Sequence, residues 1–201
     1  MAKKKSAKST QGVKENKPGW RLAMKAATLP KNDLLIALEK LEKSAEYTSW
    51  RKSEPDSYLA HFFYLDDPEN RESVQIGYYN EKKQRMTTFV VGPAGIEVQP
   101  DLEVLKREET PLLALDRGIV GFDSKTILAK ADIEQADKYP RQPVFRKFFI
   151  LQKLDIGQVY NVTLFTQTFK TINFKFDARS GELLKHNMGS LIQMDKGAGG
   201  L

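Results

Sequence analysis

Phe62-Phe63-Tyr64-Leu65 is an apolar stretch that returns 86 residues later as Phe148-Phe149-Ile150-Leu151. Matches at the same offset continue along the chain at every second residue, for example Ile76 on Val162. Alternation with a period of two is typical of β-strands. A fixed internal offset indicates a duplicated structural unit. The sequence therefore predicts two copies of one small module.

Each copy has the pattern of one helix followed by three antiparallel strands. Apolar stripes with helical spacing follow Asn32 in the first copy and Asp123 or Ser124 in the second, and these residues are suitable helix caps. The strands are expected at about 58–65, 73–79, 85–91, 144–154, 158–166 and 170–176. We therefore expect an α+β fold, a tandem repeat of two helix-on-antiparallel-sheet (αβββ) modules related by approximate twofold pseudosymmetry.

Composition changes along the chain predict five segments. They are a disordered basic tail (1–18), a first module that opens with a short helix (19–99), a packed connector (100–122), a second module (123–195) and a flexible tail (196–201). The predicted core comprises Leu34, Leu38, Leu41, Phe62 or Phe63, Ile76, Ile127, Leu128, Val162, Ile172 and Phe174.

Charge and cysteine content restrict the function classes. The net charge is +6, but residues 1–25 alone have a net charge of +7, so the rest of the chain is nearly neutral. Cysteine is absent, which excludes disulfides and thiolate chemistry. The chain has no apolar stretch of membrane-spanning length and no apolar segment behind its basic start. We expect a cytoplasmic protein without a membrane span.

Residues suited to catalysis or metal binding are sparse. The two histidines, His61 and His186, are far apart in sequence and do not fall on each other in the repeat. They give no zinc spacing and no serine-hydrolase motif. Gly92 and Gly95 fit a tight turn, and the acids of 66–70 fit a solvated loop. We expect no catalytic residue, no metal and no cofactor.

The strand faces offer a better candidate site. In the second module one face is apolar, and the opposite face mixes amide, hydroxyl and aromatic side chains. The corresponding face of the first module is more apolar, and either packs on the connector or the other module or is open for recognition. The candidate partner-binding residues are Tyr79, Phe89, Asn161, Thr163, Phe165, Thr171, Asn173 and Lys175.

The stretch from Ile172 to Leu184 contains Asp-Ala-Arg-Ser-Gly-Glu at 177–182 and resembles the closing motif of PepSY domains. The helix at 124–131 is similar to the opening helix of that family, so the resemblance covers about 123–186. In the first module only Gly95 matches the motif's glycine, Gly181. The resemblance implies PepSY/cystatin-like modules that bind or restrain protein partners, often beside peptidases, and that have no catalytic residues.

We therefore expect a non-catalytic protein- or peptide-binding module that acts through its sheets, with a regulatory role toward a partner such as a peptidase. One alternative is a weak binder of nucleic acid or anionic surfaces through the lysines of residues 3–25. Another is an enzyme that uses carboxylate, tyrosine or lysine side chains in a site without a sequence motif.

Overall fold

The computed structural model describes residues 32–69, 73–103 and 112–190. The expected basic tail (1–18), N-terminal helix (19–30) and C-terminal tail (196–201) lie outside the described residues.

Two consecutive helices precede the first strands. In α2 (Asp33–Glu42) the side chain of Asn32 accepts hydrogen bonds from the amides of Leu34 and Leu35, at 3.1 and 3.3 Å, and so caps the helix as predicted. The prediction of one helix in this half is wrong, because two helices precede its first strand. Ser44 begins a second helix, α3 (Ala45–Ser53), because its hydroxyl accepts from the amide of Tyr47.

Four strands follow these helices, and four more follow the long helix α4 (Ser124–Lys138), which is capped by Asp123. The first four are β1 (Tyr58–Asp66), β2 (Val74–Asn80), β3 (Arg85–Gly92) and β4 (Gly95–Glu103). The last four are β5 (Val144–Leu154), β6 (Gly157–Thr166), β7 (Lys170–Asp177) and β8 (Leu183–Ser190). A short 3-10 turn, η1 (Arg117–Ile119), precedes α4.

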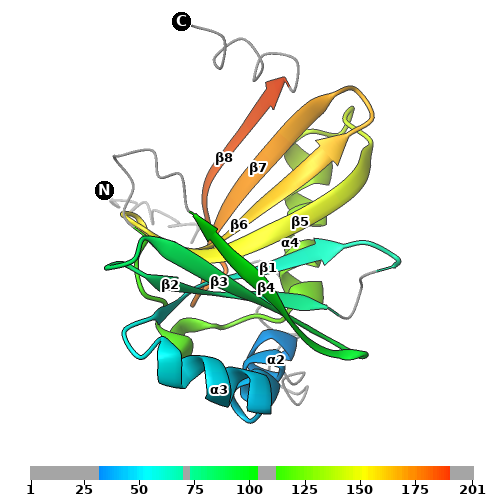
Figure 1. Ribbon diagram of the computed structural model, residues 1–201. Coiled ribbons are helices and arrows are strands. Elements are labelled where there is room, and N and C mark those ends of the chain that lie inside the picture. The colour runs from blue at the N-terminus through cyan, green and yellow to red at the C-terminus, as the bar shows by residue number, and fades with distance from the viewer. Residues whose placement is uncertain (1–31, 70–72, 104–111, 191–201) are drawn as a thin grey trace, which may run out of the picture. The chain divides into compact units, whose positions relative to one another are not determined.

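All eight strands form one antiparallel sheet in the order β4-β3-β2-β1-β5-β6-β7-β8 (Figure 1). The two halves join edge to edge where β1 pairs with β5, from His61 opposite Gln152 to Asp66 opposite Lys147. This junction is called the seam below. The α+β class is confirmed, but the expectation of two separate sheets is wrong, because the first strand of each half pairs with that of the other.

A single offset of 86 residues does not align the faces of the two halves. Ile76 and Val162 are both fully buried and are separated by 86 residues in the sequence. Their partners on the next strand, Phe89 and Phe174, are separated by one residue fewer. Their partners on the preceding strand, Phe62 and Phe149, are one residue more apart. Since a one-residue slip turns a side chain to the other face of a sheet, the predicted match of Phe62 with Phe148 joins opposite faces.

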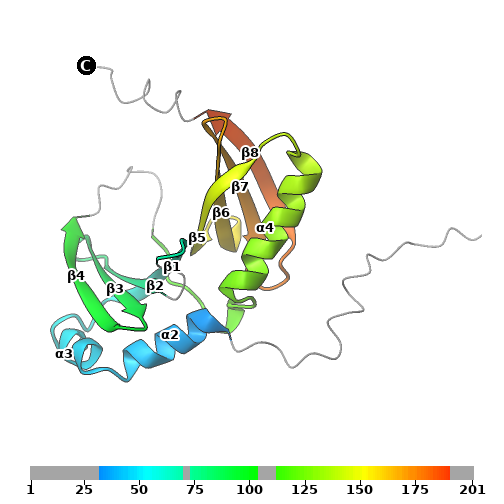
Figure 2. The same ribbon diagram turned by 90° about the vertical axis from the view of Figure 1, so that its right-hand side faces the viewer.

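The helices cover one face of the sheet, the helix face (Figure 2). The large core on this face includes every predicted core residue, with Phe62 rather than Phe63. Tyr47 and Trp50 of α3 pack on Tyr78 and Phe89, with ring centroids 5.1–6.0 Å apart. The connector residues 112–122 also contact the sheet, since the amide of Leu115 donates to the carbonyl of Leu59 at 2.9 Å.

The beginnings of α2 and α4 are bonded to each other across the two halves. One oxygen of Asp33 accepts from the amide of Ser124 at 2.9 Å and from the amide of Leu34 at 3.0 Å, and the other accepts from the Ser124 hydroxyl. Asn32 donates to the carbonyl of Val120 at 3.2 Å. These bonds fix the two helices relative to each other on the helix face.

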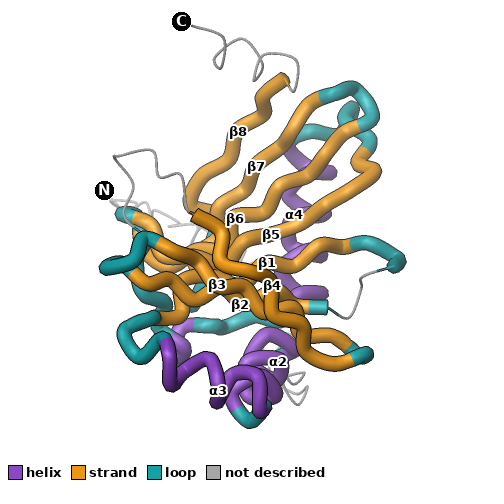
Figure 3. The backbone as a smooth tube through the Cα atoms, viewed as in Figure 1, coloured by secondary structure: helices purple, strands orange, loops and turns teal. Residues whose placement is uncertain are grey.

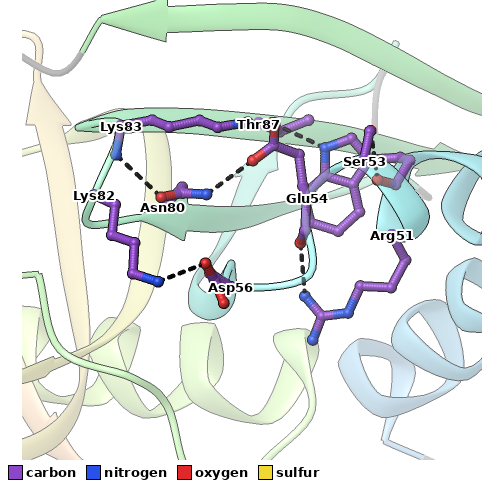
Figure 4. A network of polar contacts seen from close by, with 9 residues as sticks. Arg51, Ser53, Glu54, Asp56, Asn80, Lys82, Lys83 and Thr87 are labelled. Carbon is purple, nitrogen blue, oxygen red and sulfur yellow. Dashed lines mark hydrogen bonds and ion pairs between the residues drawn. The ribbon is translucent and has the colours of Figure 1, made fainter.

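A polar network fixes the end of α3 to the β2–β3 hairpin (Figure 4). Glu54 accepts from the Asn80 amide at 2.8 Å and pairs with Lys83, while the Trp50 indole donates to the Thr87 hydroxyl at 3.2 Å. The hydrogen bond from Lys83 lowers the pKa of Glu54 below its ordinary value, more than burial raises it. The network serves a structural role, because each charged group in it already has a partner.

Asp177 and Gly181 fix the closing turn of the second half. Asp177 accepts hydrogen bonds from the amides of Arg179 and Ser180, at 3.0 and 2.7 Å. Gly181 has a φ of 68° and Gly95 a φ of 138°, a backbone conformation that favours glycine.

We predict that Phe174→Ala lowers the free energy of unfolding by about 3–5 kcal/mol, because the side chain is fully buried and its loss leaves a cavity. Chemical denaturation measures this change. Phe145→Ala is the matched control, since that side chain is 62% exposed and its truncation should change stability by less than about 1 kcal/mol. Equal effects of the two substitutions would contradict the assignment of Phe174 to the core.

We predict that Glu54→Gln lowers the free energy of unfolding by about 1 kcal/mol at pH 7, because it weakens a hydrogen bond to a charged partner. The pKa of Glu54 is lower in the folded state than in the unfolded state, so its contribution is complete above the unfolded pKa and disappears as the pH falls through the folded pKa. Denaturation from pH 7 to pH 2 should therefore show the two proteins converging in acid. The control is Glu39→Gln in an exposed pair with Lys43, which should change little.

Candidate binding surface on the outer face of the sheet

The face of the sheet opposite the helices is called the outer face. No described helix covers it (Figures 2 and 3). Strand alternation and the cross-strand pairs place on it Phe63 of β1, with the side chains Phe148, Ile150, Asn161, Thr163, Phe165, Thr171, Asn173, Lys175, Lys185 and Asn187 of β5–β8.

Four phenylalanines form an aromatic strip on this face, comprising Phe63, Phe145, Phe148 and Phe165. The ring centroids of Phe63 and Phe148 are 5.5 Å apart, those of Phe148 and Phe165 5.8 Å, and those of Phe165 and Phe145 6.3 Å. Phe145 is 62% exposed because it lies at a register shift in the β5–β6 pairing, between Val144 and Arg146. The other three rings are partly exposed.

Polar side chains continue the surface from β6 to β8. The amide of Asn173 donates to the Thr163 hydroxyl at 3.1 Å, and the Lys175 ammonium donates to the Asn173 oxygen at 3.2 Å. The side-chain oxygen of Asn161 is buried and has no hydrogen-bond partner among the described residues. This arrangement leaves hydrogen-bonding capacity on a surface that also has apolar rings.

The structure brings most of the predicted site residues together. Asn161, Thr163, Phe165, Thr171, Asn173 and Lys175 all lie on the outer face and are partly exposed. Two predicted residues are not available to a partner, because Tyr79 and Phe89 are both fully buried.

Phe89 was assigned to the wrong face. The β2–β3 hairpin is one residue out of step with the β6–β7 hairpin, so Phe89 pairs with Ile76 and points to the helix face, where it meets Trp50. Tyr79 does lie on the outer face, but Tyr58, Met86 and Leu112 pack around it. The more apolar outer face of the first half is thus partly covered by the connector.

Six residues of this surface were not predicted, namely Phe63, Phe145, Phe148, Ile150, Lys185 and Asn187. Phe148 was visible in the sequence as a match to Phe62, but its face depended on a register that the sequence did not show. Phe145 follows from a strand irregularity, and Lys185 from the pairing of β8 with β7.

A hollow of about 280 Å³ lies on the outer face at the seam. Its lining includes His61 and Gln75 from the first half, Ile150 and Gln152 from the second, and Leu112 of the connector. The His61 ring lies against Gly77, where a Cβ atom would be 2.1 Å from its Cε1 atom. Burial lowers the pKa of His61 to about 4, so the ring is uncharged at neutral pH.

The two histidines lie on β1 and β8, which are not neighbouring strands. His186 lies far from His61 and shares a hydrogen bond of 2.7 Å with the hydroxyl of Tyr139. Within the described ranges, no cluster of three or more histidine or acidic side chains has the geometry to hold a metal ion. None of the helices described is long and apolar enough to cross a membrane.

Comparisons with known proteins do not identify a family. No family model and no curated protein matches the chain. Among solved structures, it is similar to a "putative lipoprotein" from Clostridium difficile 630, with 12% sequence identity and a TM-score of 0.48. The match covers 72% of this chain and 90% of that chain. The similarity is too distant to bear on function, and the PepSY resemblance stays a prediction.

We predict that His61 titrates near pH 4 in the folded protein, as followed by NMR of its ring. In the folded state the pKa lies below its unfolded value, so stability should fall as the pH drops from about 6.5 toward 4. Gly77→Ala should displace the ring toward solvent and raise this pKa, since the added methyl group would overlap it. A His61 pKa near 6.5 in the unmodified protein would show that the ring is not held in the sheet.

Proposed function

We propose that this protein is a non-catalytic module that binds a protein or peptide partner through the outer face of β5–β8. The observation that supports the proposal is the aromatic strip on a sheet face that no described helix covers. Exposed aromatic side chains keep apolar surface in contact with water, which is unfavourable unless a partner covers it. Such side chains are enriched where proteins bind each other.

The polar neighbours of the strip suit a peptide. Asn161, Asn173 and Asn187 lie on three adjacent strands, and Asn173 and Asn187 are directly opposite each other. Side-chain amides both donate and accept, so they can bond the main chain of an extended segment without requiring one particular sequence. Aromatic rings beside these amides would supply the apolar contact.

We also propose that the two halves arose from a tandem repeat and that each corresponds to a PepSY-like module. The palindromic strand order and the near-constant offset between equivalent strands support this idea. Regulation of a partner such as a peptidase follows from the same resemblance, and a cytoplasmic location is proposed on the separate grounds given in the sequence analysis.

The test is selection of binders from a display library of random 12-residue peptides, with the full chain as target. We expect selected peptides to lose binding when Asn173→Arg places a large side chain in the middle of the outer face. Ile133→Arg is the matched control, because Ile133 is 69% exposed on α4, on the other side of the sheet. Thermal unfolding checks that both variants are folded. Peptides that bind both variants equally well, or a library without any binder, would contradict the proposal.

A further inference from the structure

The outer face changes character along one row of cross-strand neighbours. Phe63 lies opposite Ile150, Ile150 opposite Asn161, Asn161 opposite Lys175 and Lys175 opposite Lys185, across five adjacent strands. Strands in a sheet are about 4.8 Å apart, so the apolar end and the lysine pair are separated by about 14 Å.

The two lysines at its end face each other without a carboxylate between them. Neither forms an ion pair within the described residues, and like charges directly opposite on a sheet destabilise it. The acid nearest along β7 on the same face, Asp177, accepts three hydrogen bonds within its own turn, from Arg179 and Ser180. It is therefore engaged as a turn cap, and no ion pair joins it to Lys175 or Lys185.

The environment of Lys175 agrees with an unmet requirement for negative charge. Burial lowers the pKa of Lys175, and the nearby charge of Lys185 lowers it further. Its hydrogen bond to Asn173 supplies only a neutral acceptor. The remaining acceptor in the row, the side-chain oxygen of Asn161, is buried and unpaired.

We infer that the partner of the outer face is an acidic peptide segment, which places a carboxylate between Lys175 and Lys185 and apolar side chains on Phe148 and Phe165. This inference rests on the proposed function and names the chemistry of its partner. The charge complementarity of a bare lysine pair supports it, because an incoming carboxylate relieves the repulsion and also fixes the direction of the peptide.

Single-stranded nucleic acid fits the same surface less well. A nucleic-acid strand needs a series of cations along its phosphates and free ring faces for its bases. Here Arg146, the cation next to the aromatic strip, is 3.2 Å from Asp67 and is already neutralised. The strip rings are tilted against each other at 35–39°, so they cover part of one another's faces.

The experiment compares display selections of random 12-residue peptides on the full chain and on three double variants. K175M/K185M removes the charges and keeps the apolar stems, and K175E/K185E reverses the charges. K52E/K125E is the control, because it makes the same change in net charge on the exposed helices α3 and α4. Thermal unfolding identifies any variant that does not fold, and K175M/K185M remains informative if K175E/K185E fails.

We expect enrichment of Asp and Glu in peptides selected on the unmodified protein and on K52E/K125E. The enrichment should disappear on K175M/K185M, and the affinity of an acidic selected peptide should fall by about tenfold on that variant, as expected for two partly exposed ion pairs. The nucleic-acid probe is a twelve-residue oligothymidylate. It should bind the unmodified protein no more tightly than it binds K175M/K185M.

Peptides without acidic enrichment that still lose binding on Asn173→Arg would overturn this inference and leave the proposed function in place. Lysine-dependent binding of the oligothymidylate without acidic peptides would identify a nucleic-acid partner and would also overturn it. Peptides unaffected by Asn173→Arg, or no selected peptides, would overturn both.

Discussion

The pairing of β1 with β5 is the contact on which the rest of the structure depends. Each half alone would be a four-stranded sheet with β1 or β5 as an edge, and an exposed edge with unpaired backbone groups is prone to aggregation. At the seam the edges formed by β1 and β5 pair with each other, so neither is exposed. The same pairing stacks Tyr64 on Phe149 in the centre of the helix face, with ring centroids 5.6 Å apart. It also brings the outer faces of both halves into one continuous surface, on which Phe63 meets Phe148.

The sequence was sufficient for the core and for most of the helices and strands, because both depend on local periodicity, but it did not separate α3 from α2. Helix caps at Asn32 and Asp123, the strand positions and the burial of Phe174 all follow from the spacing of apolar residues. The seam could not be predicted in this way, since nothing in a strand's own pattern tells whether its edge is free. The offset also misled, because a slip of one residue in a hairpin leaves the alternation intact and reverses the faces. Phe89 was assigned to the wrong face for that reason.

The residues of the candidate site also differ in whether local alternation was enough to predict them. Its β6 and β7 residues lie in a hairpin with regular alternation, and these were predicted correctly as one surface. The remaining members come from β5, β8 and β1, whose contribution depends on pairings between distant parts of the chain. Lys185 shows the consequence most clearly: in sequence it is one lysine near the end of the chain, and only the β7–β8 register makes it the neighbour of Lys175. The centre of the surface therefore follows from the local sequence pattern, whereas its outer residues depend on the pairing of strands that are distant in the sequence.

The Asp33 carboxylate has a consequence for the electrostatics of the helix face. The aligned peptide dipoles of a helix concentrate positive potential at its N-terminus, and an anion there is stabilising. The first residues of α2 and α4 meet at this one side chain, which accepts from Leu34 in its own helix and from Ser124 in the other. The charge of Asp33 therefore acts on two macrodipoles at once, and at α4 it adds to the charge of the capping Asp123, so the two positive helix ends can lie side by side.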